Sequence, residues 1–235
     1  MLVSWASPGA RYSYEFRQNR GVAVIEKHLQ DRIYWGLNRA ASVLGRQTDA
    51  YRPKGKSEPL ARSNRYLKLA AAFGAADGRF DKAIGFGQTT WCGYFDGSYT
   101  RVGDYLVQNN DVWFIVAQQS LLPVLCVKAN NRLSIERPVA PSTGASYGTG
   151  TTGATVTVLT NWPASLLAAD RGMKPPSQLP ADVRAPGWVG ILPSSHGQTL
   201  QAADIVTGDH GLQGIVLSAE LSDLGWRLNI GQLTT

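Results

Sequence analysis

Residues 103–116 read GDYLVQNNDVWFIV, and residues 203–216 read ADIVTGDHGLQGIV. Each stretch opens with an Asp that follows Gly or Ala, runs through apolar residues to a polar turn, and returns as a second apolar run. An Asp at the start of a strand bonds to nearby backbone, and Asn tolerates the left-handed backbone of a tight turn. Each stretch therefore predicts a pair of antiparallel strands.

The residues around the two stretches extend this similarity into a repeat at a spacing of about 100 residues. Trp91-Cys-Gly-Tyr-Phe precedes the first stretch and Trp188-Val-Gly-Ile-Leu precedes the second. Phe114-Ile-Val-Ala117 aligns with Gly214-Ile-Val-Leu217, and an apolar strand follows in both copies. Duplication of one unit explains this order, and chance likeness between short β-meanders is the alternative. In either case the pattern predicts two small antiparallel barrels or sandwiches.

One helix is predicted ahead of these modules, over residues 23–44. Its apolar positions follow a helical period: Ile25, Leu29, Ile33, Leu37, Ala41 and Leu44. Gly45 then supplies a C-terminal stop signal. The predicted fold class is mainly β with an N-terminal α-helix, comprising two small antiparallel β-barrel or sandwich modules plus an extended arm.

Five segments are expected along the chain. They are an N-terminal arm (1–22), a helix with an irregular basic segment (23–80), β-module 1 (81–138), a Ser-, Thr- and Gly-rich linker (139–153) and β-module 2 (154–235). The arm either orders against a neighbour or packs locally. The irregular chain after the helix is long for a compact monomer, which predicts a segment lying on other subunits.

The net charge of +6 is concentrated in the first third of the chain. Residues 1–80 contain 14 Lys and Arg against 6 Asp and Glu, whereas residues 81–235 contain 9 against 11. An acidic partner, either protein or nucleic acid, is therefore expected at the N-terminal third. No apolar run reaches the ~18–20 residues of a membrane span, and no signal peptide is expected.

The chemistry-bearing residues do not form a recognisable site. The three histidines make no His-x-x-x-His pair, and Cys92 and Cys126 cannot form a zinc site alone. Asp104 and Asp204 stand at turn–strand junctions, where a carboxylate usually caps backbone. We therefore expect no catalytic residue, no metal site and no cofactor, and predict that the chain is not an enzyme.

Aromatic and basic side chains are the candidates for partner contact. Trp91, Trp113, Trp188 and Trp226 lie in strand patterns, where core packing is expected. The remaining tryptophans and the helix residues beside them are better anchors between subunits. The candidate partner-binding residues are Arg32, Tyr34, Trp35, Arg39, Trp5 and Trp162.

Several runs carry a likeness to a known group of proteins. They are Gly103-Asp-Tyr-Leu-Val, Val112-Trp-Phe-Ile-Val-Ala-Gln-Gln, Leu121-Leu-Pro-Val-Leu-Cys-Val, Arg32-Ile-Tyr-Trp-Gly-Leu-Asn-Arg-Ala-Ala41 with Tyr51-Arg-Pro53, and Ala219-Glu-Leu-Ser-Asp-Leu-Gly-Trp-Arg-Leu228. These runs resemble small virion proteins of tailed bacteriophages, encoded near the portal and major capsid genes. The β-module whose strand opens with Gly-Asp resembles head-closure, or stopper, and neck proteins.

The resemblance implies a homo-oligomeric ring at the head-to-tail junction of a virion assembled in the host cytoplasm. The partners it implies are the portal or an adjacent neck or tail protein, with possible non-specific contact with packaged DNA and no membrane. A minimal stopper has one β-module, so the second module and the basic arm leave stopper, adaptor and collar roles open.

Two other functions remain as alternatives. One is a tail or baseplate component that binds host surface glycan through its Trp-bearing β-modules. The other is a small hydrolase acting on cell wall, for which the sequence lacks a paired-carboxylate or triad signature.

Overall fold

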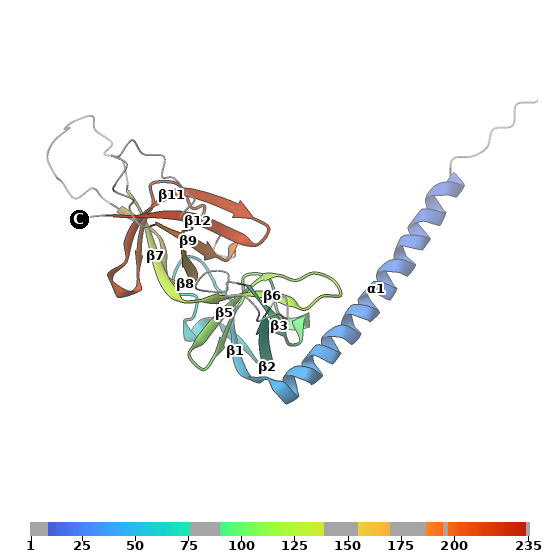
Figure 1. Cartoon of the computed structure of the whole chain (residues 1–235). Helices are drawn as coiled ribbons and strands as arrows, with labels where there is room; N and C mark the ends of the chain where they lie inside the picture. Colours follow the sequence, from blue (N-terminus) through green and yellow to red (C-terminus); the bar gives the residue numbers. More distant parts are fainter. Residues whose placement is uncertain (1–8, 76–89, 139–154, 170–186, 195–196, 234–235) are drawn as a thin grey trace, which may run out of the picture.

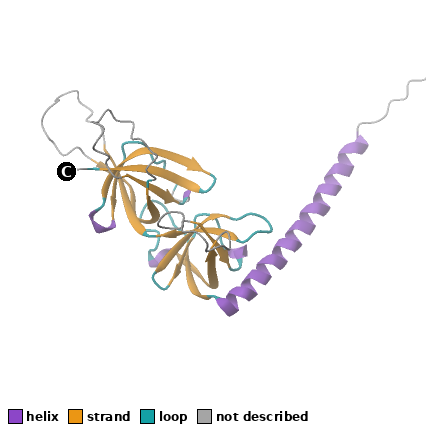
Figure 2. Cartoon of the chain, viewed as in Figure 1, coloured by secondary structure: helices purple, strands orange, loops and turns teal. Residues whose placement is uncertain are grey.

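A computed structural model of the chain describes residues 9–75, 90–138, 155–169, 187–194 and 197–233. One long helix, α1 (Gly9–Leu44), leads into a body made of two closed six-stranded barrels. Figure 1 shows α1 running away from this body, which only the C-terminal part of the helix contacts. The fold class is therefore mainly β with an N-terminal helix and two β-barrels, as predicted (Figure 2).

Both barrels use the same strand order. Barrel 1 contains β1 (Arg46–Tyr51), β2 (Arg65–Ala75), β3 (Thr90–Tyr94), β4 (Tyr105–Gln108), β5 (Asp111–Ala117) and β6 (Val124–Ala129), arranged β1-β2-β3-β6-β5-β4. Barrel 2 contains β7 (Asn131–Pro138), β8 (Thr155–Ala168), β9 (Gly187–Leu192), β10 (Ile205–Gly208), β11 (Gln213–Ser222) and β12 (Gly225–Gln232), arranged β7-β8-β9-β12-β11-β10. Strands β1 to β6 thus correspond one to one with β7 to β12, and the predicted repeat is a repeat of whole barrels.

The strand registers correct the predicted alignment of the two copies by one residue. Tyr105 pairs with Phe114 in barrel 1, and Ile205 pairs with Ile215 in barrel 2. The equivalent of Phe114 is therefore Ile215 and not Gly214. The turn between β10 and β11 is longer than its counterpart because it includes a short 3-10 helix, Asp209–Gly211.

The module boundaries also differ from those expected. Within the segment expected to be irregular, residues 46–51 and 65–75 form β1 and β2 of barrel 1. Residues 131–138, assigned to module 1, form β7, which pairs with β8 and β10 of barrel 2. The stretch 139–153 therefore connects two strands of barrel 2 and does not link the modules; it lies outside the described residues. The arm expected over residues 1–22 is helical from Gly9 onward.

A single residue, Asn130, separates the last strand of barrel 1 from the first strand of barrel 2. Its side-chain amide donates to the Leu166 carbonyl at 2.7 Å and accepts from the Leu166 amide at 2.8 Å. Its backbone amide donates to the Ala164 carbonyl at 3.0 Å. The connection is therefore bonded into β8, which fixes the chain at the point where it passes between barrels.

The loop after β1 packs on barrel 2 of the same chain, and not on another subunit as predicted. The Lys56 carbonyl accepts from the Thr160 amide at 3.1 Å and from the Trp162 indole at 3.0 Å. Asn161 donates its side-chain amide to Glu58 at 3.0 Å. The contacts with barrel 2 therefore explain why the segment between β1 and β2 is long.

An apolar core lies between the barrels. Tyr105 and Phe114 of barrel 1 belong to the same buried cluster as Trp162 and Leu228 of barrel 2. Trp162 is 0% exposed, and its ring meets Tyr105 edge-on at 6.0 Å. The Tyr105 hydroxyl donates to the Pro163 carbonyl at 2.8 Å. Trp162 therefore joins the two barrels, and its predicted role as an anchor between subunits is wrong.

An arginine–aspartate pair closes each barrel. In barrel 1, Arg52 donates from Nε to Asp104 Oδ1 at 2.9 Å and from Nη2 to Oδ2 at 2.7 Å. In barrel 2, Arg137 donates to Asp204 in the same way, at 2.7 and 2.9 Å. Each arginine stands at the end of the first strand and each aspartate immediately precedes the fourth. These strands pair in both barrels, so we call the two ion pairs the closure clamps.

The aspartates of the closure clamps are almost fully buried, with Asp104 2% and Asp204 1% exposed. Each also caps backbone as predicted, since the amide of Arg101 or of Gln201 donates to its Oδ2 at 2.9 Å. The residue before each aspartate takes a left-handed backbone, with φ of 89° at Gly103 and 70° at Ala203. Each buried carboxylate is therefore hydrogen-bonded by both a guanidinium group and a backbone amide.

We predict that Arg137→Ala destabilises the fold by about 3–5 kcal/mol, because it leaves the buried Asp204 carboxylate without its counter-ion. The measurement is the free energy of unfolding from urea denaturation. Arg65→Ala, which breaks the more exposed pair with Asp49, is the control and should cost no more than about 1 kcal/mol. Equal losses from both variants would contradict a special role for the clamp.

We further predict that Trp162→Ala destabilises the protein by about 3–5 kcal/mol, since it empties the core between the barrels. Trp162→Phe keeps an aromatic ring but removes the bond to the Lys56 carbonyl, and should cost less than Trp162→Ala. Urea denaturation followed by circular dichroism measures both. A Trp162→Ala protein as stable as the parent would show that the barrels do not depend on this side chain.

Candidate functional site

Helix α1 is fixed to barrel 1 by its last turns. Gly45 ends the helix, and a Cβ there would lie 2.5 Å from the carbonyl oxygens of Ala41 and Ala71, so only glycine fits. Gly45 is not left-handed, so its role is close approach to β2 and not the αL cap typical of helix ends. The next contact up the helix is Tyr34, whose ring lies over Gly97 so closely that a Cβ there would be 2.7 Å from it.

The furthest described hydrogen bond along the helix joins Gln30 to the turn between β5 and β6. The Gln30 side-chain carbonyl accepts from the backbone amide of Leu121 at 2.6 Å. The residues on the barrel side of α1 are Gln30, Ile33, Tyr34, Leu37 and Ala41, all buried or half-buried. The predicted apolar stripe is thus covered at Ile33, Leu37 and Ala41, whereas Ile25, Leu29 and Leu44 are exposed.

The opposite side of the helix carries apolar and basic side chains that face solvent. It consists of Ile25, Leu29, Arg32, Trp35, Arg39 and Val43, which we call the outer face of α1. At 3.6 residues per turn these positions share one side of the helix, roughly opposite the barrel side. Trp35 is 70% exposed. A tryptophan this exposed beside arginines is typical of a binding anchor.

The structure thus separates the sequence-predicted partner residues. Arg32, Trp35 and Arg39 lie together on the outer face. Tyr34 points the other way, and its half-buried ring packs on Gly97 of its own barrel. Trp162 is buried between the barrels. Trp5 lies outside the described residues.

A shallow hollow on this face is lined by His28, Asp31, Arg32 and Trp35. Asp31 is the acidic member, and in the described part of the chain it forms no ion pair with either arginine. The hollow therefore presents an aromatic ring beside one acidic and one basic side chain. These are the features of a protein contact surface, in which aromatic and arginine side chains are enriched.

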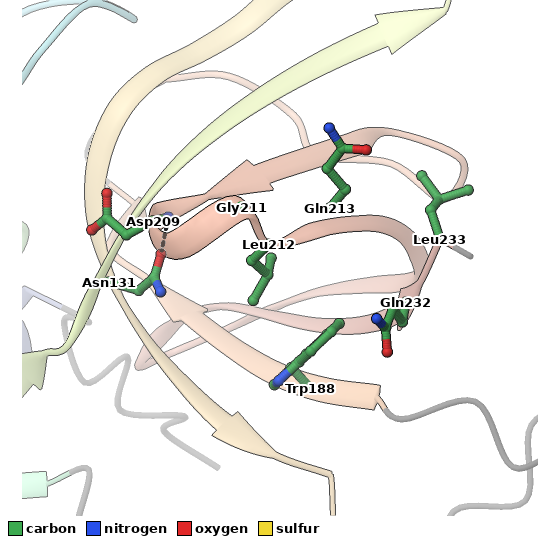
Figure 3. Close-up of a pocket in the computed structure, with 8 residues that line it drawn as sticks. All are labelled: Asn131, Trp188, Asp209, Gly211, Leu212, Gln213, Gln232 and Leu233. Atoms are coloured by element: carbon green, nitrogen blue, oxygen red, sulfur yellow. Dashed lines mark hydrogen bonds between the residues drawn. The ribbon is translucent and has the colours of Figure 1, made fainter. Parts of the chain in front are cut away.

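A second hollow, of about 530 Å³, opens at one end of barrel 2 (Figure 3). Its lining residues are Asn131, Trp188, Asp209, Gly211, Leu212, Gln213, Gln232 and Leu233. Two hydrogen bonds join the start of β7 to the turn after β10. The Asp209 amide donates to the Asn131 side chain and the Arg132 amide donates to the Asp209 side chain, both at 3.0 Å. Trp188, Gln213 and Gln232 form the rest of the polar and aromatic lining.

The residues missed by sequence reasoning are the arginines of the closure clamps. Both precede a proline, as Arg52-Pro53 and Arg137-Pro138, so a repeated Arg-Pro dipeptide ahead of each repeated Asp was the available signal. The hydrogen bond to Asp104 raises the pKa of Arg52, and the one to Asp204 raises the pKa of Arg137. The two arginines therefore stay charged beside their aspartates.

Within the described residues, no cluster of three or more His, Cys, Asp or Glu side chains is placed to hold a metal ion. None of the described helices combines the length and apolar character needed to cross a membrane. Comparison of the chain with family models, with curated proteins and with solved structures gave no match. The outer face of α1 and the hollow of barrel 2 both place aromatic side chains where a partner or ligand can reach them.

Proposed function

We propose that this chain is a non-enzymatic structural virion protein of a tailed phage, which forms a homo-oligomeric ring at the head-to-tail junction. The ring connects the portal or capsid to the tail and seals or channels the genome. The resemblance of the barrel strands and of the helix to neck proteins supports this proposal. The observation that carries it is the outer face of α1, an exposed aromatic and basic surface on a helix that extends beyond its own barrel.

The barrels suit the wall of such a ring. Their cores are filled by side chains such as Phe114 and Leu228, both 0% exposed, and the closure clamps hold the strand ends. The basic excess within residues 1–80 is shared between α1 and the first two strands of barrel 1 with their loop. Residues 9–44 contain 6 Lys and Arg against 3 Asp and Glu, and residues 45–75 contain 7 against 2. A basic helix fits an acidic protein surface, and the exposed Trp35 favours a protein partner over DNA.

A second candidate function is glycan binding in the hollow of barrel 2. Trp188 offers an aromatic face on which a sugar ring can stack, and Gln213 and Gln232 offer amides that bond hydroxyl groups. This arrangement supports the alternative of a tail or baseplate component that binds host surface sugar.

We predict that Trp35→Ala gives phage particles without tails while the purified subunit stays folded. Trp35 is exposed, so its removal leaves the barrel core intact but takes an anchor from the partner contact. Electron microscopy of the particles and circular dichroism of the subunit are the two measurements. Tyr99→Ala, which removes an exposed aromatic ring outside α1, is the control and should leave tails in place. Normal virions from the Trp35→Ala phage would refute the neck assignment.

For the second candidate, we predict that the full chain binds specific glycans on an array and that Trp188→Ala reduces this binding at least ~10-fold. The full chain is required because β7 is part of barrel 2 and the barrels share a core. Gln213→Ala should weaken binding less, since it removes only one hydrogen-bonding group. Absence of any glycan signal from the full chain would eliminate this function.

A further inference from the structure

The hairpin formed by β11 and β12 has an exposed acidic and apolar tip. Residues 217–224 read LSAELSDL, with two acids and no Lys or Arg. Glu220 and Asp223 are exposed, Leu221 is 57% exposed and Leu224 is exposed as well. We call Glu220, Leu221, Asp223 and Leu224 the hairpin tip. Arg227 lies opposite Glu220 in register but forms no ion pair with it in the described part of the chain.

The far part of this hairpin projects beyond the barrel wall (Figure 1). Strand β10 pairs with β11 only over Gln213–Ile215, so residues 218–222 of β11 pair with β12 alone. An uncovered strand edge with exposed leucines is a common site of association. The hairpin tip is therefore a second unoccupied surface, opposite in charge to the outer face of α1.

The repeat indicates what the hairpin tip binds. In barrel 1, the equivalent turn between β5 and β6 contacts a helix, because the Leu121 amide donates to Gln30 of α1. In barrel 2, the turn between β11 and β12 has no helix of its own, since Asn130 alone precedes β7. The strands of the barrel 2 hairpin run further before the turn, with ten residues in β11 against seven in β5, and the turn itself is shorter, residues 223–224 against 118–123. The second copy of the barrel thus has a longer strand pair at the place of the helix-contacting turn but lacks the helix.

We propose that the hairpin tip of one copy docks on the outer face of α1 of the next copy. Glu220 and Asp223 would face Arg32 and Arg39, and the leucines of the tip would pack beside these arginines on the outer face. Neither arginine has an ion-pair partner among the described residues, so both are available. The inference rests on the proposed ring, for which it names the contact between neighbouring subunits.

This contact joins two different surfaces, so each copy offers one surface to each neighbour. Repetition of such a head-to-tail contact closes a ring when the rotation between copies permits it. Pairing of α1 with α1 is the competing arrangement. Positions 25, 29, 32, 36, 39 and 43 have the spacing of a helix–helix seam, but Arg32 and Arg39 would then meet their own copies. Like charges in the seam disfavour this arrangement, whereas the acidic hairpin tip neutralises them.

Charge reversal of each surface tests the proposal on the full chain. Variant one is Arg32→Glu with Arg39→Glu, and variant two is Glu220→Arg with Asp223→Arg. Each variant alone should self-associate on the order of 10-fold or more weakly than the parent, because both of its docking surfaces then carry the same sign. An equimolar mixture should assemble again, since each reversed surface meets a complementary one on the other chain. Mass photometry measures the oligomers.

Arg62→Glu reverses an exposed charge on barrel 1 away from both surfaces and should assemble as the parent does. The proposal is overturned if the parent chain stays monomeric, if either variant alone assembles normally, or if the mixture is not restored. Its failure is distinguishable from failure of the neck function. Tailless particles from Trp35→Ala, together with normal assembly of variant two, would keep the neck function and remove this contact.

Discussion

The two closure clamps are the constraint on which the body of the molecule depends. A six-stranded barrel closes only if its first and fourth strands meet, and in both barrels a buried aspartate and an arginine join those strands with two hydrogen bonds. The register agrees as well: Tyr51 pairs with Tyr105 and Glu136 with Ile205, which puts each arginine one residue further along, beside its aspartate. Because each aspartate lacks access to water, only the closed arrangement satisfies its charge.

Once the barrels are closed, their contact follows from a small number of residues. Because Asn130 alone connects β6 to β7, the barrels must lie against each other. The apolar side chains at that junction, including Tyr105 and Trp162, form a common core. Polar atoms there are also satisfied, since the Trp162 indole and the Tyr105 hydroxyl both find backbone carbonyls. Helix α1 and the β11–β12 hairpin therefore extend from one body with a common core.

The sequence predicted the features that local residue chemistry determines. The helix over 23–44, the strand pairs after Asp104 and Asp204 and the repeat of the two stretches all follow from period, turn residues and apolar runs. The predictions failed where a partner far along the chain decides the structure. Strand β1, RQTDAY, has a polar face and gave no strand pattern, but it is fixed by β2 and β4 on either side. Strand β7 was assigned to the wrong barrel because pairing with β8 lies beyond a stretch of linker composition.

Contacts far along the chain also explain why the sequence did not distinguish the candidate partner residues that are exposed from those that pack within the protein. Tyr34 and Trp35 are neighbours in sequence, and only the rotation of α1 on barrel 1 sends the first against Gly97 and the second into solvent. Trp162 lies next to Pro163 at an irregularity of β8, which as sequence indicates an exposed turn. In three dimensions that irregularity is where barrel 1 packs.

Repetition of the same strand order gives this chain two barrels whose surfaces differ. Identical modules would present identical surfaces, and a head-to-tail ring requires two unlike ones. The differences lie at equivalent places: barrel 1 keeps its β5–β6 turn against α1, and barrel 2 extends the strands of the corresponding hairpin into solvent, where the tip carries acids and leucines. Mutations in either tip would leave the closure clamps untouched, because those lie at the first and fourth strands. The fold thus separates the residues that close each barrel from the residues of the proposed contact, so the contact surfaces can change without loss of barrel closure.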